Sequence, residues 1–126
     1  MLNDEQKTWG LKERTKKFAL RIVRLYSSLE KRGAAEVIGK QLLRCGTSVG
    51  AQYREAARAR SVAEFISKTE SATQELDETS YWLELLQDSK LVEERLLSDL
   101  HRETDELLRI LTASVKTAKH NKEMRQ

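Results

Sequence analysis

The sequence predicts an all-α protein, an antiparallel up-down-up-down four-helix bundle. Three observations carry this prediction. The 126 residues contain no proline, four long segments repeat apolar residues at steps of three and four, and only short breaks separate the segments. Proline is the residue that most strongly interrupts helices, and the alternating steps give the narrow apolar seam of packed helices. Short connections make successive helices antiparallel neighbours.

The helix boundaries follow from local signals. A single domain over residues 1–126 is expected, with helices at about residues 11–31, 34–59, 61–88 and 93–119. Gly33 supplies a left-handed stop after the first helix. Ser61 and Glu64 form a capping box that begins the third helix. Residues 120–126 are expected to fray.

Each segment has its own apolar seam, and together the four seams predict one shared core. The first seam contains Leu11, Thr15, Phe18, Ile22, Leu25 and Leu29, and the second contains Ile38, Leu42, Cys45, Val49, Gln52 and Ala56. The third contains Phe65, Thr69, Ala72, Leu76, Thr79, Leu83 and Leu86, and the fourth contains Leu97, Leu100, Thr104, Leu107 and Leu111.

Two glycines lie inside the second helix, at Gly46 and Gly50. Each mid-helix glycine costs about 0.5–1 kcal/mol relative to alanine. Close approach of a neighbouring helix would compensate this cost, and we expect such an approach at the two glycines.

Polar side chains lie at or beside the seams, at Ser48, Gln52, Glu55 and Thr79. Two interpretations are open. The hydroxyl groups bond to carbonyl groups of their own helix while the longer side chains reach solvent. Alternatively, the four groups form a connected polar layer that fixes the register of the helices, because buried polar groups must be paired.

Positive charge is concentrated in the first half of the chain. Residues 1–60 contain 14 Lys and Arg against 6 Asp and Glu, a balance of +8, whereas residues 61–126 contain 9 against 14, a balance of −5. Basic residues at helical spacing can follow a phosphate backbone. The candidate nucleic-acid-binding residues are Lys17, Arg21, Arg24, Lys40, Arg44, Arg54, Arg58 and Arg60. The alternative interpretation is an ordinary solvated helix face.

Several large apolar residues lie off the seams, where a monomer would carry polar groups. Clustered apolar residues on a surface are typical of protein interfaces. A homo-oligomer is therefore expected, and the candidate interface residues are Leu20, Leu43, Tyr81, Trp82 and Leu85.

Features of most enzyme classes are absent from the sequence. The positions three residues before His101 and His120 hold Ser98 and Thr117, so neither histidine belongs to the Glu-x-x-His pair of a di-iron bundle. The one cysteine, Cys45, excludes an internal disulfide framework. No phosphate loop or nucleophile motif appears, and no apolar run reaches the roughly 18 residues of a membrane span. We expect a cytoplasmic protein that is not an enzyme and has no cofactor.

Three runs resemble a known family. The run QLLRCGTSVGAQYREA (residues 41–56), the run FISK (residues 65–68) and the run ELDETSYWLELL (residues 75–86) are similar to the second and third helices of the four-helix bundle proteins encoded in 23S rRNA intervening sequences. The resemblance implies a small bacterial bundle that assembles as a ring, with homopentamers among its relatives. It also implies an architecture related to the retroelement accessory variability protein, a basic pentamer that binds nucleic acid and a reverse transcriptase.

Two functions from different classes remain open. The first is an oligomeric, non-enzymatic bundle that binds RNA or DNA backbones through its basic face without base specificity. The second is a protein-interaction scaffold, in which basic and acidic hairpins of neighbouring subunits pair and no nucleic acid is bound.

Overall fold

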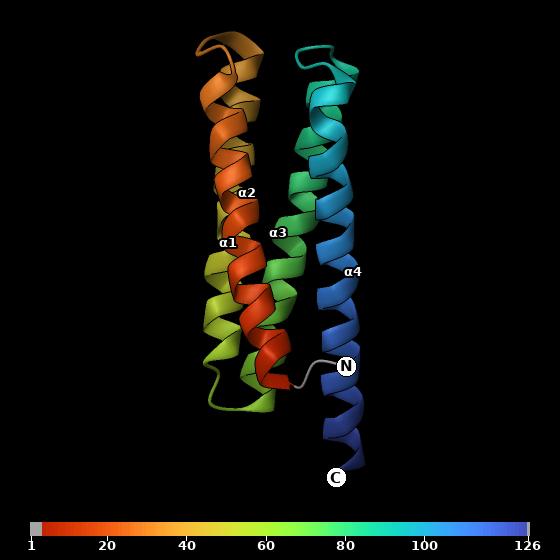
Figure 1. The fold of residues 1–126 in the computed structure, drawn as a ribbon. Coiled ribbons are helices and arrows are strands. Elements are labelled where there is room, and N and C mark those ends of the chain that lie inside the picture. Colours follow the sequence, from red (N-terminus) through yellow and green to blue (C-terminus); the bar gives the residue numbers. More distant parts are fainter. Residues whose placement is uncertain (1–3, 126) are drawn as a thin grey trace.

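The computed structural model describes residues 4–125, with side chains from Gly10 onward. It contains α1 (Asp4–Ser28), α2 (Gly33–Ala57), α3 (Val62–Asp88) and α4 (Glu94–Met124). Successive helices lie side by side and run in opposite directions along one long axis (Figure 1). The expected four-helix bundle is confirmed.

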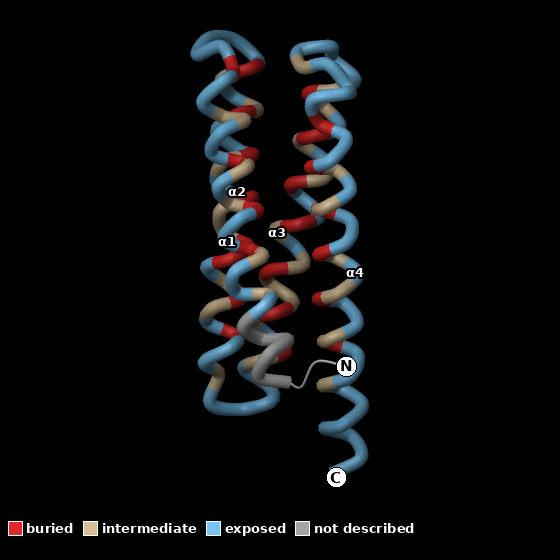
Figure 2. The backbone as a smooth tube through the Cα atoms, in the orientation of Figure 1, coloured by how far each residue is buried: buried red, intermediate tan, exposed pale blue. Residues whose placement is uncertain are grey.

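The core lies along the central axis, where the buried positions of the helices face one another (Figure 2). Most predicted seam residues are buried there. The core cluster includes Phe18, Ile22, Leu42, Val49, Leu76, Leu83, Leu86, Leu97, Leu107 and Leu111. Removing this apolar surface from water is the main force that holds the helices together.

Two seam assignments are wrong by one residue. On α2 the buried residue is Tyr53, which is 3% exposed, and Gln52 is only half-buried. On α3 Ile66 is buried and Phe65 is half-buried. The cause on α2 is contact with both α1 and α3. Two neighbours bury a wider face of a helix than a single seam covers.

Small residues bring α1 and α2 close together, as expected from the glycines. A Cβ atom placed on Gly46 would lie 2.7 Å from Cγ1 of Ile22, and one on Gly50 would lie 3.4 Å from Oγ1 of Thr15. Gly39 lies under the ring of Tyr26 in the same way. The side chains of α1 therefore pack directly on the backbone of α2.

The stop predicted at Gly33 is wrong: α1 already ends at Ser28, and Gly33, with a φ of +62°, is the first residue of α2. The cap predicted at Ser61 is confirmed, because Ser61 Oγ accepts a hydrogen bond from the backbone N–H of Glu64 at 3.0 Å. The carboxylate of Glu64 accepts from the backbone N–H of Arg60 at 3.0 Å, so the box closes one residue earlier than in its usual form. Lys90, with a φ of 62°, ends α3 without a glycine.

Both outer helices are longer than predicted. The first begins by Asp4, not near residue 11, and α4 continues to Met124, beyond the expected end at residue 119. Neither extension contains a proline, and the residues after Lys119 are mostly ordinary helix formers. The last turns of α4 consequently extend past the end of the other helices (Figure 1).

The helices do not contact one another equally. The contact between α2 and α3 is the most extensive, and the contact between α1 and α4 is small. A charged pair crosses the α1–α4 side, where Arg14 donates two hydrogen bonds to Glu103 at 2.8 and 2.6 Å. The bundle is therefore more open between its first and last helices than elsewhere.

The packing of α1 on Gly46 and Gly50 predicts opposite effects on the free energy of unfolding for two alanine substitutions in α2. Gly46→Ala is expected to lower the free energy of unfolding by about 1–2 kcal/mol, because the new methyl group overlaps the branched side chain of Ile22. Gly50→Ala is expected to raise it by up to about 1 kcal/mol, because contact with Thr15 is ordinary and alanine favours the helix. Urea unfolding of both variants measures the difference. Equal effects would contradict the packing described.

Candidate nucleic-acid interface

The basic row on α1 borders the acidic face of α4. It begins at Arg14, which pairs with Glu103 at 2.6 Å and with Glu106 at 3.0 Å. Lys17, Arg21 and Arg24 continue at helical spacing and have no ion pair with any described residue. The two glutamates neutralise only the first residue of the row.

The basic row on α2 is partly neutralised within the chain. Lys40 pairs with Glu36 one turn earlier at 3.1 Å. Arg44 pairs with Glu75 at 3.5 Å and also with Glu78, both on α3. Acidic neighbours therefore occupy two of the eight candidate binding residues, one through a carboxylate of α2 itself and the other through two carboxylates of α3.

The two rows do not form one flank. Arg14 reaches α4, and Arg44 reaches α3, so the rows border opposite sides of the α1–α2 hairpin. Helical spacing places residues on one face of their own helix, but it does not fix the relative rotation of two helices.

A second group of cations lies near the contact between Thr15 of α1 and Gly50 of α2. The exposed Lys12 and Lys16 lie within one turn of Thr15, which faces Gly50. Arg54 lies one turn after Gly50, and Arg58 lies two turns after it. We call Lys12, Lys16, Arg54 and Arg58 the basic cluster.

The basic cluster has no ion pair with any residue that the structure describes. The guanidinium of Arg58 donates to the carbonyl of Arg54 at 3.5 Å and so lies back along α2. Lys12 and Lys16 were not among the predicted binding residues, although Gly50 is the sequence signal for the close helix contact that they flank. The lysine and arginine side chains of the basic cluster can donate hydrogen bonds to successive phosphates of a nucleic-acid backbone.

The ion pairs change the pKa values of the groups involved. Hydrogen bonds to Glu103 raise the pKa of Arg14 above its ordinary value, and hydrogen bonding to Glu78 raises that of Arg44. Burial raises the pKa of Glu75, although the charge of Arg44 opposes this effect. These arginines remain charged and are held by carboxylates of their own chain.

The prediction of a connected polar layer is wrong. Ser48 donates to the carbonyl of Arg44 at 2.6 Å, and Thr79 donates to the carbonyl of Glu75 at 2.8 Å. Glu55 is exposed and pairs with Lys68 at 2.9 Å. Buried Oε1 of Gln52 has no hydrogen-bond partner. Hydroxyl groups on a helix reach the carbonyl one turn back, and a carboxylate avoids desolvation at the surface.

The predicted interface residues divide by exposure. Leu20 is 49% exposed on α1, and Tyr81 is 54% exposed on α3. Leu43 and Trp82 are half-buried and pack against the core, and Leu85 is half-buried on α3. Of the five predicted interface residues, only Leu20 and Tyr81 are exposed, and they lie on different helices; Val37 on α2 and Leu96 on α4 are also exposed.

Both histidines lie on α4. His120 is exposed and His101 is half-buried on α4. No group of three or more His, Cys, Asp or Glu in the described part of the chain is placed to hold a metal ion. Among the helices between residues 4 and 125, none has the length and apolar character to cross a bilayer.

The fold and charge distribution define a small four-helix bundle with a basic first hairpin. Residues 7–113 match the sequence profile of the 23S rRNA-intervening sequence proteins, and the chain belongs to this family. A similar solved structure is a protein of unknown function from the S23 ribosomal protein family of Bacteroides thetaiotaomicron. It is 37% identical, with a TM-score of 0.81, over 87% of this chain and 98% of that chain. A search of curated proteins finds no match.

Cys45 is buried, and its thiol is therefore expected to be protected from reagents in solution. Its sulfur accepts a hydrogen bond from Thr79 Oγ1 at 3.2 Å, and burial raises the pKa of the thiol. At pH 8 we expect an aromatic disulfide reagent to react with Cys45 far more slowly in the folded protein than in urea.

The sign of the accompanying pH effect follows from the raised pKa of Cys45. The unfolded thiol ionises near its usual pKa of about 8.5, so the stability that Cys45 contributes is complete below that pH and is lost as pH rises through the folded value. A labelling rate equal to that of the urea-unfolded chain would contradict the buried position.

Proposed function

We propose that this protein is a non-enzymatic, oligomeric bundle that binds the backbone of RNA or DNA through its α1–α2 hairpin without base specificity. The observation that carries the proposal is the basic cluster of Lys12, Lys16, Arg54 and Arg58. These four cations flank the contact between Thr15 of α1 and Gly50 of α2 and have no ion pair with any described residue. Cations without acidic partners bind phosphates and release the counterions of the nucleic acid.

The α1 row extends the binding surface. Lys17, Arg21 and Arg24 add three cations that no described carboxylate neutralises. Arg44 and Lys40 contribute less, because Glu78 and Glu36 already hold them. Phosphate contacts fix position on the strand and carry no sequence information by themselves, which is why we propose binding without base specificity.

The accessible apolar residues support assembly of the bundle with copies of itself. Leu20 and Tyr81 lie on different helices. An interface in which one patch meets the other is heterologous and closes into a ring when the rotation allows it. We propose a ring in the cytoplasm, a pentamer by the family resemblance, with the basic cluster left free for nucleic acid.

Charge reversal tests the nucleic-acid surface. The triple variant Lys12→Glu, Lys16→Glu, Arg58→Glu is expected to abolish binding of a fluorescent duplex at low salt, measured by anisotropy. A milder variant replaces one of these cations by a neutral residue. Its slope of log affinity against log salt is expected to be smaller in magnitude than that of the wild type by about 0.9 for each phosphate contact removed.

A matched control carries the same change in net charge on the outer part of α4. Arg102→Glu, Arg109→Glu, Lys116→Glu is expected to retain binding, because these exposed residues lie away from the hairpin. Equal loss in both triple variants would contradict a defined surface. Loss of the oligomer in the first variant alone would favour the interaction scaffold over nucleic-acid binding.

Complementary variants test head-to-tail assembly. Leu20→Asp and Tyr81→Asp are each expected to give monomers in sedimentation velocity, whereas Thr112→Asp on the exposed side of α4 is expected to preserve the oligomer. Each monomer retains one intact patch, so an equal mixture is expected to form dimers and nothing larger. A wild-type monomer at all concentrations, or a mixture that stays monomeric, would contradict this assembly.

A further inference from the structure

A cavity of about 430 Å³ opens at the end of the bundle where α2 turns into α3. The turn and the first residues of α3 form one wall, and the last turns of α4 form the other. This wall exists because α4 extends past its neighbours (Figure 1). The lining residues that matter here are Arg60, Ser61, Phe65, Asn121, Lys122 and Arg125.

Three cations line this cavity, and its lining includes no acidic residue among those whose side chains the structure describes. The side chains of Arg60, Lys122 and Arg125 have no ion pair with any described residue. The nearby carboxylate of Glu64 accepts from the backbone N–H of Arg60. The N-terminus of α3 adds the positive end of a helix dipole on the same side. The cavity is therefore built to attract an anion.

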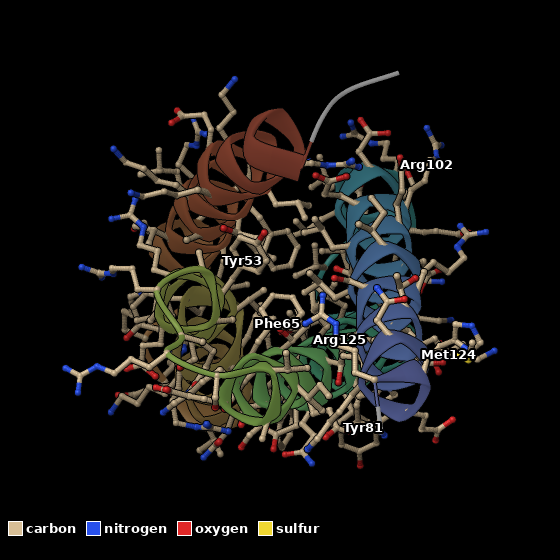
Figure 3. All side chains as sticks on the ribbon, turned by 90° about the horizontal axis from the view of Figure 1, so that it is seen from below. Tyr53, Phe65, Tyr81, Arg102, Met124 and Arg125 are labelled. Carbon is tan, nitrogen blue, oxygen red and sulfur yellow. The ribbon has the colours of Figure 1, made fainter. Side chains whose placement is uncertain are left out.

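A larger cavity of about 760 Å³ adjoins it and is mainly apolar. The two share Phe65, Ala118 and Asn121. Tyr53 and Phe65 lie toward the centre of the bundle end, and Arg125 reaches over the same region from α4 (Figure 3). The larger cavity also includes Arg14, but Glu103 and Glu106 neutralise its charge.

We propose that these adjoining cavities bind the phosphate-bearing end of a nucleic-acid strand, with the terminal phosphate at Arg60, Lys122 and Arg125 and the terminal base against Phe65. This inference rests on the proposed function and specifies which part of the nucleic acid binds at this end of the bundle. Aromatic side chains bind bases of any sequence by stacking. Arginine and lysine bind the phosphate oxygens.

The number of cations favours a terminal phosphate over other anions. A phosphomonoester carries about −1.5 to −2 charge at pH 7, whereas a phosphodiester or a carboxylate carries a single charge. Three unpaired cations match the higher charge. The apolar cavity beside them accommodates an uncharged ring, which separates this ligand from inorganic phosphate.

Calorimetry with mononucleotides tests the site directly. We expect AMP to bind about tenfold or more tightly than adenosine, a difference of about 1.4 kcal/mol. A short single strand with a 5′-phosphate is expected to compete with AMP, and the same strand with a 5′-hydroxyl is expected to compete about tenfold less well.

Matched variants test which side chains bind the phosphate and which bind the base. Arg60→Gln, Lys122→Gln, Arg125→Gln is expected to remove the preference for AMP over adenosine. The control Arg102→Gln, Arg109→Gln, Lys116→Gln lies on exposed α4 positions outside both cavities and is expected to keep that preference. Phe65→Ala is expected to weaken AMP and adenosine alike, with circular dichroism confirming that helicity is retained.

Three results would overturn the proposal: equal binding of AMP and adenosine, no binding of either, or tighter binding of decanoate than of AMP. The last would identify a site for fatty acids. Duplex binding without a preference for AMP would overturn this inference and leave the proposed function intact. A preference for AMP and for the phosphorylated strand, without duplex binding, would support this site and contradict the α1–α2 surface.

Discussion

The close packing of α1 on the glycine face of α2 is the constraint on which the rest of the structure depends. Ile22 packs against Gly46, where an added methyl group would overlap it, and Thr15 packs against Gly50 at ordinary contact distance. Lys12 and Lys16 of α1 and Arg54 and Arg58 of α2 flank the Thr15–Gly50 contact, so the basic cluster takes its cations from both helices. The glycines lower the stability of α2 as a helix, but they also allow the close helix contact that the cations flank.

The charges of the bundle separate into those that hold helices and those that face solvent. Arg14 and Arg44 join the basic hairpin to α4 and α3, and their carboxylate partners come from the acidic half of the chain. The basic cluster has no such partner among the described residues. Exposed ion pairs add little stability, so the distribution of unpaired cations is more informative about binding than about folding.

Most of the fold follows from the sequence, because seam spacing and the Ser61 cap are local signals. The positions of Tyr53 and Ile66 do not follow, since they depend on how two neighbours share one helix face. The polar layer failed because Ser48 and Thr79 find partners within their own helices. The cationic cavity could not be predicted, because Arg60 and Arg125 are brought together only by the extra length of α4.

We propose that the α1–α2 hairpin is the surface that contacts nucleic acid. Hydrogen exchange of the wild-type protein, with and without a saturating RNA duplex, measures this surface without any substitution. The account predicts slower exchange at the amides of α1 and α2 around Lys16 and Arg54, and unchanged exchange along the outer face of α4. Protection confined to α3 and α4, or no protection anywhere, would contradict it.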